Sequence, residues 1–292
     1  MAESRLGLGT VQFGVPYGIA NRTGRAVPAE LAAAILGRAA DAGINTLDTA
    51  ISYGDSEALL GAIGVSTWRV VSKLPLVPDG CPDVEGWMRT AVADSLRRLR
   101  LDRLYGLLLH HPQQLVGRHG AALAAALVSL RDSGRIEKIG VSIYSPEELD
   151  AYASLLDLDL VQAPFNVMDR RLATSGWLER LQNQGTEVHV RSIFLQGLLL
   201  MDPAHRPPYF ARWHETWDLW HQWLRAQSLT ALQACVAFAF SYSGIQRVIV
   251  GVDSLQQFEE ILEASDVQTK SPPVQLATDD CELVDPAKWT VR

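Results

Sequence analysis

Short apolar runs recur along the chain, and segments with helical periodicity lie between them. The runs are apolar at consecutive positions, as expected for parallel strands that are covered by helices. They comprise residues 6–13, 44–49, 70–74, 105–110, 138–144, 159–165, 186–194 and 247–252. Strands and helices that alternate in this way predict an α/β fold, a (β/α)8 TIM barrel formed as a single domain by residues 1–292. An open doubly wound sheet is the alternative, but no G-x-G-x-x-G motif follows the first run.

Two segments interrupt the alternation. Residues 202–228 contain tryptophans 213, 217, 220 and 223, whose spacing places them on one stripe of a helix. We expect a Trp-rich helical insertion before the last strand that packs on the barrel or on a neighbouring helix, with a substrate or subunit surface as the alternative. Residues 271–292 lack helical periodicity and are expected to form a C-terminal tail over the barrel rim.

Composition and charge restrict the class of protein. The formal net charge is −7 and no block of five basic residues occurs, which argues against nucleic-acid and anionic-membrane partners. Cys81, Cys235 and Cys281 are too widely spaced to suggest a disulfide framework or a metal site. The N-terminus does not resemble a signal peptide, and no apolar run is long enough to cross a membrane. A cytoplasmic protein is expected, either a monomer or a weak homo-oligomer.

Four polar residues follow or end strand-like runs, and a barrel would bring them to one rim. They are Asp48, Tyr53, Lys73 and His110. A phenol titrates near 10, so a neighbouring cation is needed to stabilise its anion, and a carboxylate is needed to hold that cation. The set is therefore suited to protonating a carbonyl oxygen. Each residue alone could have a structural role, such as a Lys73–Asp48 ion pair, but the combination favours catalysis.

The order and spacing of these residues resemble those of the aldo-keto reductases. The resemblance extends from LGLGTVQFG through DAGINTLDTAISYGDSE, VVSKL, LLLHHP and IGVSIYS to IVGVDSLQQFEEIL. It implies that Tyr53 is the general acid, that Lys73 lowers its pKa and that Asp48 holds Lys73. It also implies that His110 orients the carbonyl, and that the cofactor is NADPH, with NADH as an alternative.

The resemblance further implies a nicotinamide site, where the chain departs from the family pattern. Ser142 and Gln162 match positions that hold the carboxamide, but Ile143 stands where relatives often have Asn. Arg191 stands where many relatives have an aromatic ring that stacks on the nicotinamide. Its guanidinium could stack in the same way, contact a phosphate or an anionic substrate, or pair with a nearby carboxylate.

The rest of the dinucleotide is expected along two further segments. The resemblance implies that Ser192, Phe194, Gln196 and Gly197 lie beside the pyrophosphate. The implied adenosine-binding residues are Gly251, Val252, Asp253, Ser254, Gln257 and Glu260. Relatives that prefer NADP usually have Lys or Arg near Asp253, so the acidic residue indicates NAD use, dual use or a weakly held cofactor.

The substrate side of the site is expected in the loop after the first strand. Gln12, Phe13 and Tyr17 are predicted to line it. His111 is predicted to form pocket wall or to pack against the loop, with its side chain directed away from His110. Mixed aromatic and polar lining suits a sugar-like carbonyl. The predicted function is reduction of an aldehyde or ketone to an alcohol. The alternatives are a redox-neutral lyase or epimerase that acts on a sugar derivative, and a nicotinamide-sensing regulatory subunit.

Overall fold

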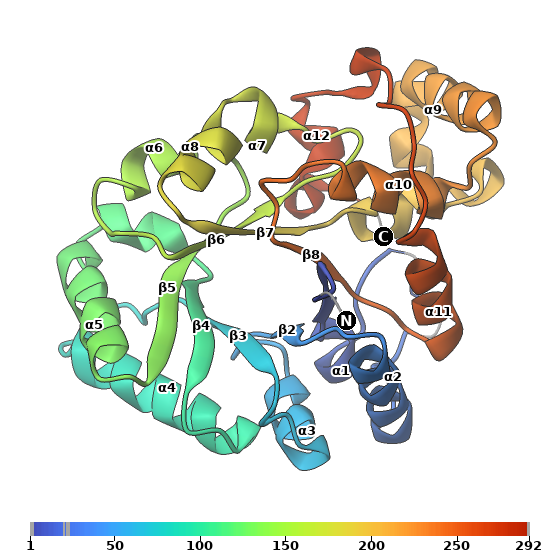
Figure 1. Cartoon of the computed structure of the whole chain (residues 1–292). Helices are drawn as coiled ribbons and strands as arrows, with labels where there is room; N and C mark the ends of the chain where they lie inside the picture. Colours follow the sequence, from blue (N-terminus) through green and yellow to red (C-terminus); the bar gives the residue numbers. More distant parts are fainter. Residues whose placement is uncertain (1–2, 20, 22–23, 291–292) are drawn as a thin grey trace.

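Parallel strands form a closed barrel in the computed structural model, which describes residues 3–19, 21 and 24–290. Each strand pairs with the next one in the chain, and β1 closes the ring by pairing with β8 (Figure 1). The strands of the described residues are β1 (Leu6–Gly9), β2 (Thr46–Asp48), β3 (Arg69–Leu74), β4 (Leu104–Leu109), β5 (Ile136–Ser142), β6 (Leu160–Pro164), β7 (Glu187–Arg191) and β8 (Arg247–Val250). The predicted (β/α)8 TIM barrel is confirmed.

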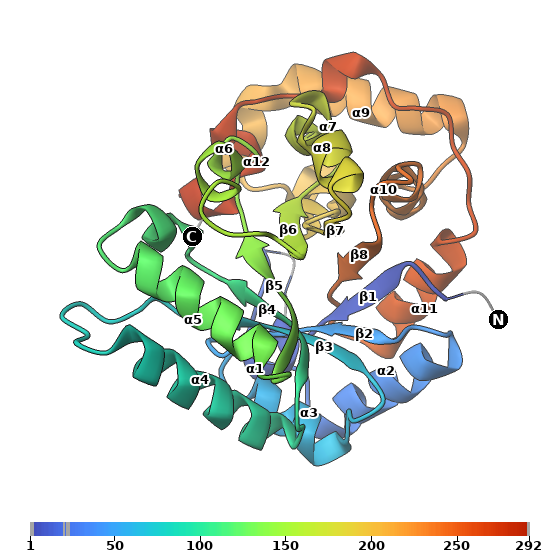
Figure 2. The ribbon, with the colours of Figure 1, turned by 60° about the vertical axis from the view of Figure 1, so that its left-hand side comes forward.

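Helices surround the ring of strands (Figures 1 and 2). The α-helices of the described residues are α1 (Val11–Gly14), α2 (Ala29–Asp41), α3 (Ser56–Ile63), α4 (Val84–Leu99), α5 (Gly120–Asp132), α6 (Glu148–Tyr152), α7 (Arg171–Thr174), α8 (Trp177–Asn183), α9 (His214–Gln227), α10 (Ala231–Phe240), α11 (Leu255–Ala264) and α12 (Cys281–Val284). Short 3-10 helices are η1 (Pro112–Val116), η2 (Leu195–Leu200), η3 (Pro203–His205), η4 (Pro208–Trp213), η5 (Val274–Leu276) and η6 (Pro286–Lys288).

Several predicted strands were too long at their carboxyl ends. Residues 11–13 belong to α1, because the chain leaves the sheet at Thr10, whose N–H donates to the Asp48 carbonyl at 2.9 Å. Residues 192–194 lie beyond β7, because Ser192 has a left-handed φ of 61°. Apolar residues continue past these strand ends, so hydrophobicity alone did not locate the boundaries.

Alternation along the strands determines which side chains face the barrel interior. Val71, Leu108 and Leu160 form a small apolar cluster that is separate from the main core between strands and helices. Lys73, His110 and Gln162 lie two positions further along the same segments. They are therefore expected on the same inward face, next to the carboxyl ends of the strands.

The Trp-rich segment packs as expected. It lies between β7 and β8, and Trp217, Trp220 and Trp223 are buried. The Trp220 and Trp223 rings stack with centroids 5.7 Å apart, and the Trp220 Nε1–H donates to the Leu199 carbonyl at 3.4 Å. These tryptophans therefore fix α9 against the loop after β7. They pack within the molecule, as expected, and do not form a substrate or subunit surface.

The C-terminal tail lies over the loop that follows β6, as expected, but short helical turns interrupt it. The Arg170 guanidinium donates to the Pro272 carbonyl at 3.3 Å and to the Pro273 carbonyl at 2.9 Å. The Thr278 N–H donates to the Met168 carbonyl at 2.9 Å. Figure 1 shows α12 and α9 on the same side of the barrel.

None of the helices within residues 3–19, 21 and 24–290 combines the length and apolar character needed to cross a membrane.

We expect Trp220→Ala to lower the free energy of unfolding by about 3–5 kcal/mol, because it leaves a cavity at a fully buried position. Urea denaturation would measure this change. Val116→Ala is the control, since Val116 is 61% exposed and its truncation should change the free energy of unfolding by less than about 0.5 kcal/mol. Equal effects of the two substitutions would contradict the packing described for α9.

Candidate active site

A buried ion pair lies at the carboxyl ends of β2 and β3. The Lys73 ammonium donates to Asp48 Oδ1 at 2.6 Å and to the Thr49 carbonyl at 2.9 Å. Their side chains are only 1% and 7% exposed. The second oxygen of Asp48 accepts a hydrogen bond from Gln162 Nε2 at 2.6 Å. Both carboxylate oxygens are therefore engaged, which fixes the orientation of the carboxylate and of the ammonium that it holds.

Tyr53 lies in the turn between β2 and α3, and α1 packs closely against this turn. A Cβ atom on Gly14 would come within 1.8 Å of the Tyr53 carbonyl oxygen, so only glycine allows this approach. Ser56 Oγ donates to the Thr10 carbonyl at 2.9 Å, and Thr10 Oγ1 donates to the Asp48 carbonyl at 3.0 Å. The turn that carries Tyr53 is thereby tied to the strand end that carries Asp48.

The predicted tetrad is assembled in one place. Lys73 Nζ lies 5.1 Å from the centroid of the Tyr53 ring, and the His110 ring meets that ring edge-on with centroids 5.9 Å apart. Ser52 Oγ lies 3.4 Å from His110 Nδ1, within hydrogen-bond distance. Asp48, Tyr53, Lys73 and His110 therefore form one cluster from three successive strand ends.

The electrostatics of Tyr53 differ from the expectation. Burial raises the pKa of its phenol, the Asp48 carboxylate raises it further, and the Arg191 guanidinium opposes both effects. The expected net lowering by Lys73 was wrong, because Lys73 turns its ammonium to Asp48 and to the Thr49 carbonyl. Burial also lowers the pKa of Lys73, and Asp48 counteracts this change. The phenol is thus protonated at neutral pH.

His110 is a neutral imidazole at neutral pH. Burial lowers its pKa from 6.5 to about 4, and the neighbouring Lys73 charge contributes to this decrease. His111 is exposed, does not line the cavity, and has its Nδ1 3.5 Å from Gln113 Nε2, so it lies against the loop and does not form pocket wall. β4 ends at Leu109, so strand alternation does not separate the two histidines, whose ring centroids lie 5.4 Å apart.

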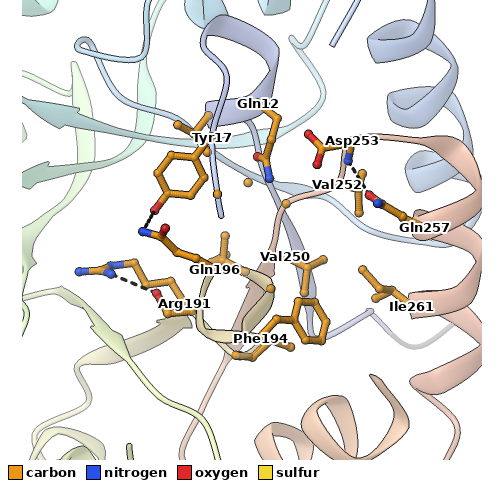
Figure 3. Close-up of a pocket in the computed structure, with 18 of the residues that line it drawn as sticks. Gln12, Tyr17, Arg191, Phe194, Gln196, Val250, Val252, Asp253, Gln257 and Ile261 are labelled. Carbon is orange, nitrogen blue, oxygen red and sulfur yellow. Dashed lines mark hydrogen bonds between the residues drawn. The ribbon is translucent and has the colours of Figure 1, made fainter. Parts of the chain in front are cut away.

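A cavity of about 490 Å³ opens at this rim of the barrel. Figure 3 shows its lining, with Arg191 and Tyr17 at one end and Asp253, Gln257 and Ile261 at the other. The predicted site residues that line it are Gln12, Tyr17, Asp48, Tyr53, Arg191, Ser192, Phe194, Gln196, Gly197, Gly251, Val252, Asp253, Gln257 and Glu260. Residues from β1, β2, β7, β8 and α11 thus meet around one space.

The loop after β7 carries unusual backbone geometry where it borders the cavity. Ser192, Leu195 and Gln196 have positive φ angles of 61°, 49° and 53°, although none is glycine. Left-handed backbone is unfavourable for such residues, and it often concentrates at functional sites. Gln196 lies beside Tyr17 in the cavity wall, and its Nε2 donates to the Tyr17 hydroxyl at 3.3 Å (Figure 3).

Several predicted residues lie outside the cavity. Phe13 is buried in the main core, because α1 turns it inward, so its predicted role in the pocket was wrong. Ser254 is the N-cap of α11, where its hydroxyl accepts from the Gln257 N–H at 3.2 Å. Ser142 and Gln162 are buried below the cavity, and Ser142 Oγ donates to Gln162 Oε1 at 3.3 Å. Their contact with a carboxamide stays a prediction.

The cavity also has lining residues that the sequence analysis did not identify. They include Thr10, Asn21, Thr230, Leu232 and Ile261. Ile261 lies four residues after Gln257 on α11, so helical spacing could have located it. Asn21 Nδ2 donates to Asp253 Oδ1 at 3.2 Å, a contact that joins two distant loops and that no local pattern predicts.

Comparison with known proteins agrees with this geometry. The sequence profile described as the aldo/keto reductase family matches residues 5–277, nearly the whole chain. The chain belongs to the aldo/keto reductase family. Membership supports carbonyl reduction by an oxidoreductase enzyme.

Two similar aldo/keto reductases have sugar-related names. The chain is 27% identical to D-threo-aldose 1-dehydrogenase of a Pseudomonas species, over 80% of this chain and 84% of that protein. It is 23% identical to L-glyceraldehyde 3-phosphate reductase of Escherichia coli, over 86% and 83% of the two chains.

The fold is also that of solved aldo/keto reductases. The holo form of an aldo-keto reductase from Bacillus halodurans superposes with a TM-score of 0.71 at 20% identity, covering 94% of this chain and 91% of that one. The glycerol dehydrogenase of Gluconobacter oxydans has a TM-score of 0.70 at 21% identity, covering 92% and 88%.

We expect the folded aldo/keto reductase to resist protonation of His110 between pH 6.5 and about 4, because its pKa is lowered to about 4. The unfolded chain takes up this proton first, so the free energy of unfolding falls as the pH falls through this range. His110→Gln should make that fall less steep. Urea denaturation at several pH values and NMR titration of the imidazole would measure both effects. An NMR midpoint near 6.5 would contradict the structure.

Proposed function

We propose that the protein reduces an aldehyde or ketone to an alcohol with a nicotinamide cofactor, and that Tyr53 is the general acid. The buried Lys73–Asp48 pair, 5.1 Å from Tyr53 as measured from Nζ to the ring centroid, is the observation that carries the proposal. A structural ion pair would not need a partly exposed phenol beside it. This phenol lines a cavity large enough to hold ligands.

The described residues suit a dinucleotide. Gln12 Oε1 is buried and has no hydrogen-bond partner among the described residues, so it is free to accept from a ligand amide or hydroxyl. Gly251 lies against this amide, since a Cβ on it would come within 2.5 Å of Gln12 Nε2. Glycine at this position leaves room for the Gln12 amide, so the side of the cavity at β8 has an unused acceptor, as expected where a ligand binds.

Two segments would hold the cofactor. Ser192, Phe194, Gln196 and Gly197 follow β7 and would contact its central part. Gly251, Val252, Asp253, Gln257 and Glu260 follow β8 and would contact its adenosine end. Members of this family use nicotinamide cofactors, typically NADPH, with NADH as the alternative here. When bound, the nicotinamide supplies the hydride.

The chain's own residues would supply the proton. As a carbonyl carbon gains a hydride, negative charge develops on its oxygen, and the Tyr53 hydroxyl would give its proton to that oxygen. The Arg191 charge would stabilise the phenolate that remains. Asp48 would keep Lys73 charged and oriented, and Gln162 would position Asp48 through its 2.6 Å hydrogen bond. Neutral His110 would orient the carbonyl through a hydrogen bond.

The substrate class is proposed to be small and polyhydroxylated. Two similar proteins are named for aldose and glyceraldehyde 3-phosphate chemistry, which supports this choice. The Tyr17 hydroxyl and the Gln196 amide add polar groups to the cavity lining. Product mass separates reduction, which adds two hydrogens, from the redox-neutral alternative.

Tyr53→Phe should lower kcat by about 100- to 10,000-fold with little change in cofactor affinity, because only the transferable proton is removed. NADPH or NADH oxidation with an aldose panel measures kcat, and fluorescence titration measures the Kd of the cofactor. Tyr152→Phe is the matched control, since Tyr152 lies on α6 and its hydroxyl contacts Glu148. Undiminished turnover in Tyr53→Phe would remove Tyr53 as the acid.

Asp253→Arg should raise the affinity for NADPH relative to NADH by at least about tenfold, because it replaces a repelling carboxylate with a guanidinium that can bind the 2′-phosphate. Asp253→Asn separates loss of the negative charge from gain of the positive charge. Titrations of both variants with both cofactors give the ratios of Kd. An unchanged ratio in Asp253→Arg would show that the adenosine end lies elsewhere.

A further inference from the structure

Arg191 carries a positive charge at the cavity that no carboxylate of the described residues neutralises. It is the last residue of β7, and its Nη2–H donates to the Ile143 carbonyl at 3.0 Å. Its Nη1–H donates to Ser192 Oγ at 3.3 Å. Within the described residues no ion pair involves Arg191, whereas Arg171, also near the rim, pairs with Asp169 at 2.8 Å. The interpretation of Arg191 as half of an ion pair is therefore wrong.

The guanidinium lies at the catalytic end of the cavity. From β7 it reaches past β6 to the end of β5, where its Cζ lies 4.7 Å from the centroid of the Tyr144 ring. Figure 3 shows it on the Tyr17 side, away from Asp253 and Gln257. Its charge lowers the pKa of both Tyr53 and His110, so it acts electrostatically on both members of the tetrad that face the carbonyl.

A partly buried guanidinium with unused donors is an anion site. Arginine has five N–H donors, and the described residues use two of those of Arg191. Its planar fork matches the oxygens of a carboxylate or a phosphate. The proposed adenosine-binding residues lie at the opposite end of the cavity, so an anion that reaches Arg191 comes more readily from the substrate than from that half of the cofactor.

We propose that Arg191 binds an anionic group of the substrate, a carboxylate or a phosphate, and that the enzyme therefore acts on anionic aldehydes or ketones. This inference rests on the proposed function and specifies its substrate class. Arg191 would hold the substrate's charged end while Tyr53 and His110 face its carbonyl oxygen. A neutral carbonyl compound would leave the guanidinium without a counter-charge, so the enzyme would bind it more weakly than the anionic substrate.

Two matched pairs of carbonyl compounds test the proposal. Succinic semialdehyde against butanal tests a carboxylate, and D-glyceraldehyde 3-phosphate against D-glyceraldehyde tests a phosphate. We expect the wild type to have a KM about 10- to 100-fold lower for the anionic member of at least one pair, as is typical of one charge-assisted interaction. The pair that shows this difference identifies the anionic group.

Variants assign the difference to Arg191. Arg191→Met should abolish the preference by raising KM for the anionic member alone, whereas the loss of kcat that follows from removing the charge beside Tyr53 should be the same for both members. Arg191→Lys should retain part of it, since the charge remains but the fork is lost. Arg97→Met is the control, because Arg97 is 73% exposed on α4 and pairs with Asp94. The preference should persist in this control.

Three results would overturn the proposal. One is a wild type that does not distinguish the members of either pair, and another is a preference that survives in Arg191→Met. The third is an Arg191→Met variant that binds the cofactor more weakly and raises KM equally for both members, which would assign Arg191 to the cofactor.

Failure of the proposed function gives a different pattern, namely no turnover of any of the four compounds by the wild type. Calorimetric titration with the alcohols of both pairs, 4-hydroxybutyrate against 1-butanol and glycerol 3-phosphate against glycerol, then tests Arg191 independently of turnover. Binding of one anion alone that is lost in Arg191→Met would support the inference. Absence of a preference for the anion in both pairs would overturn it.

Discussion

The site depends on one ion pair formed away from water, that of Lys73 with Asp48. Burying either charge alone is unfavourable, and removing one partner of such a pair typically costs about 3–5 kcal/mol. Here the pair is held by the Thr49 carbonyl on one side and by Gln162 on the other. The charges are stable only because β2, β3 and β6 bring all of these groups to one rim. The proposed chemistry therefore requires the closed barrel, because the barrel brings both charges and their hydrogen-bond partners together.

Two cations lie near the Tyr53 phenol, and they differ in whether a carboxylate pairs with them. Lys73 is paired with Asp48, and burial together with the Asp48 carboxylate raises the pKa of Tyr53. Arg191 has no carboxylate partner within the described residues, and it is the cation that opposes the raised pKa. The raised pKa keeps the proton on Tyr53 at neutral pH, as the proposed role of general acid requires.

Sequence reasoning located the fold and the tetrad because both depend on local patterns. Apolar runs and their helical spacers predicted the barrel, and strand ends predicted the rim that unites Asp48, Tyr53, Lys73 and His110. The errors concern features that depend on tertiary contacts. Phe13 was predicted to line the pocket, but α1 turns it into the core. The pKa of Tyr53 was predicted to fall, but burial and Asp48 raise it. The Asn21–Asp253 contact between distant loops has no local signal.

The short helix α1 contacts two parts of the site that are far apart in the sequence. Gln12 packs on the bare backbone of Gly251 beside β8, and two residues later Gly14 packs on the carbonyl of Tyr53. The four residues Val11–Gly14 therefore border both the β8 side of the cavity and the turn that carries Tyr53. No larger residue fits at Gly14 without moving that turn, so the accuracy with which the phenol is placed depends on a side chain that is missing.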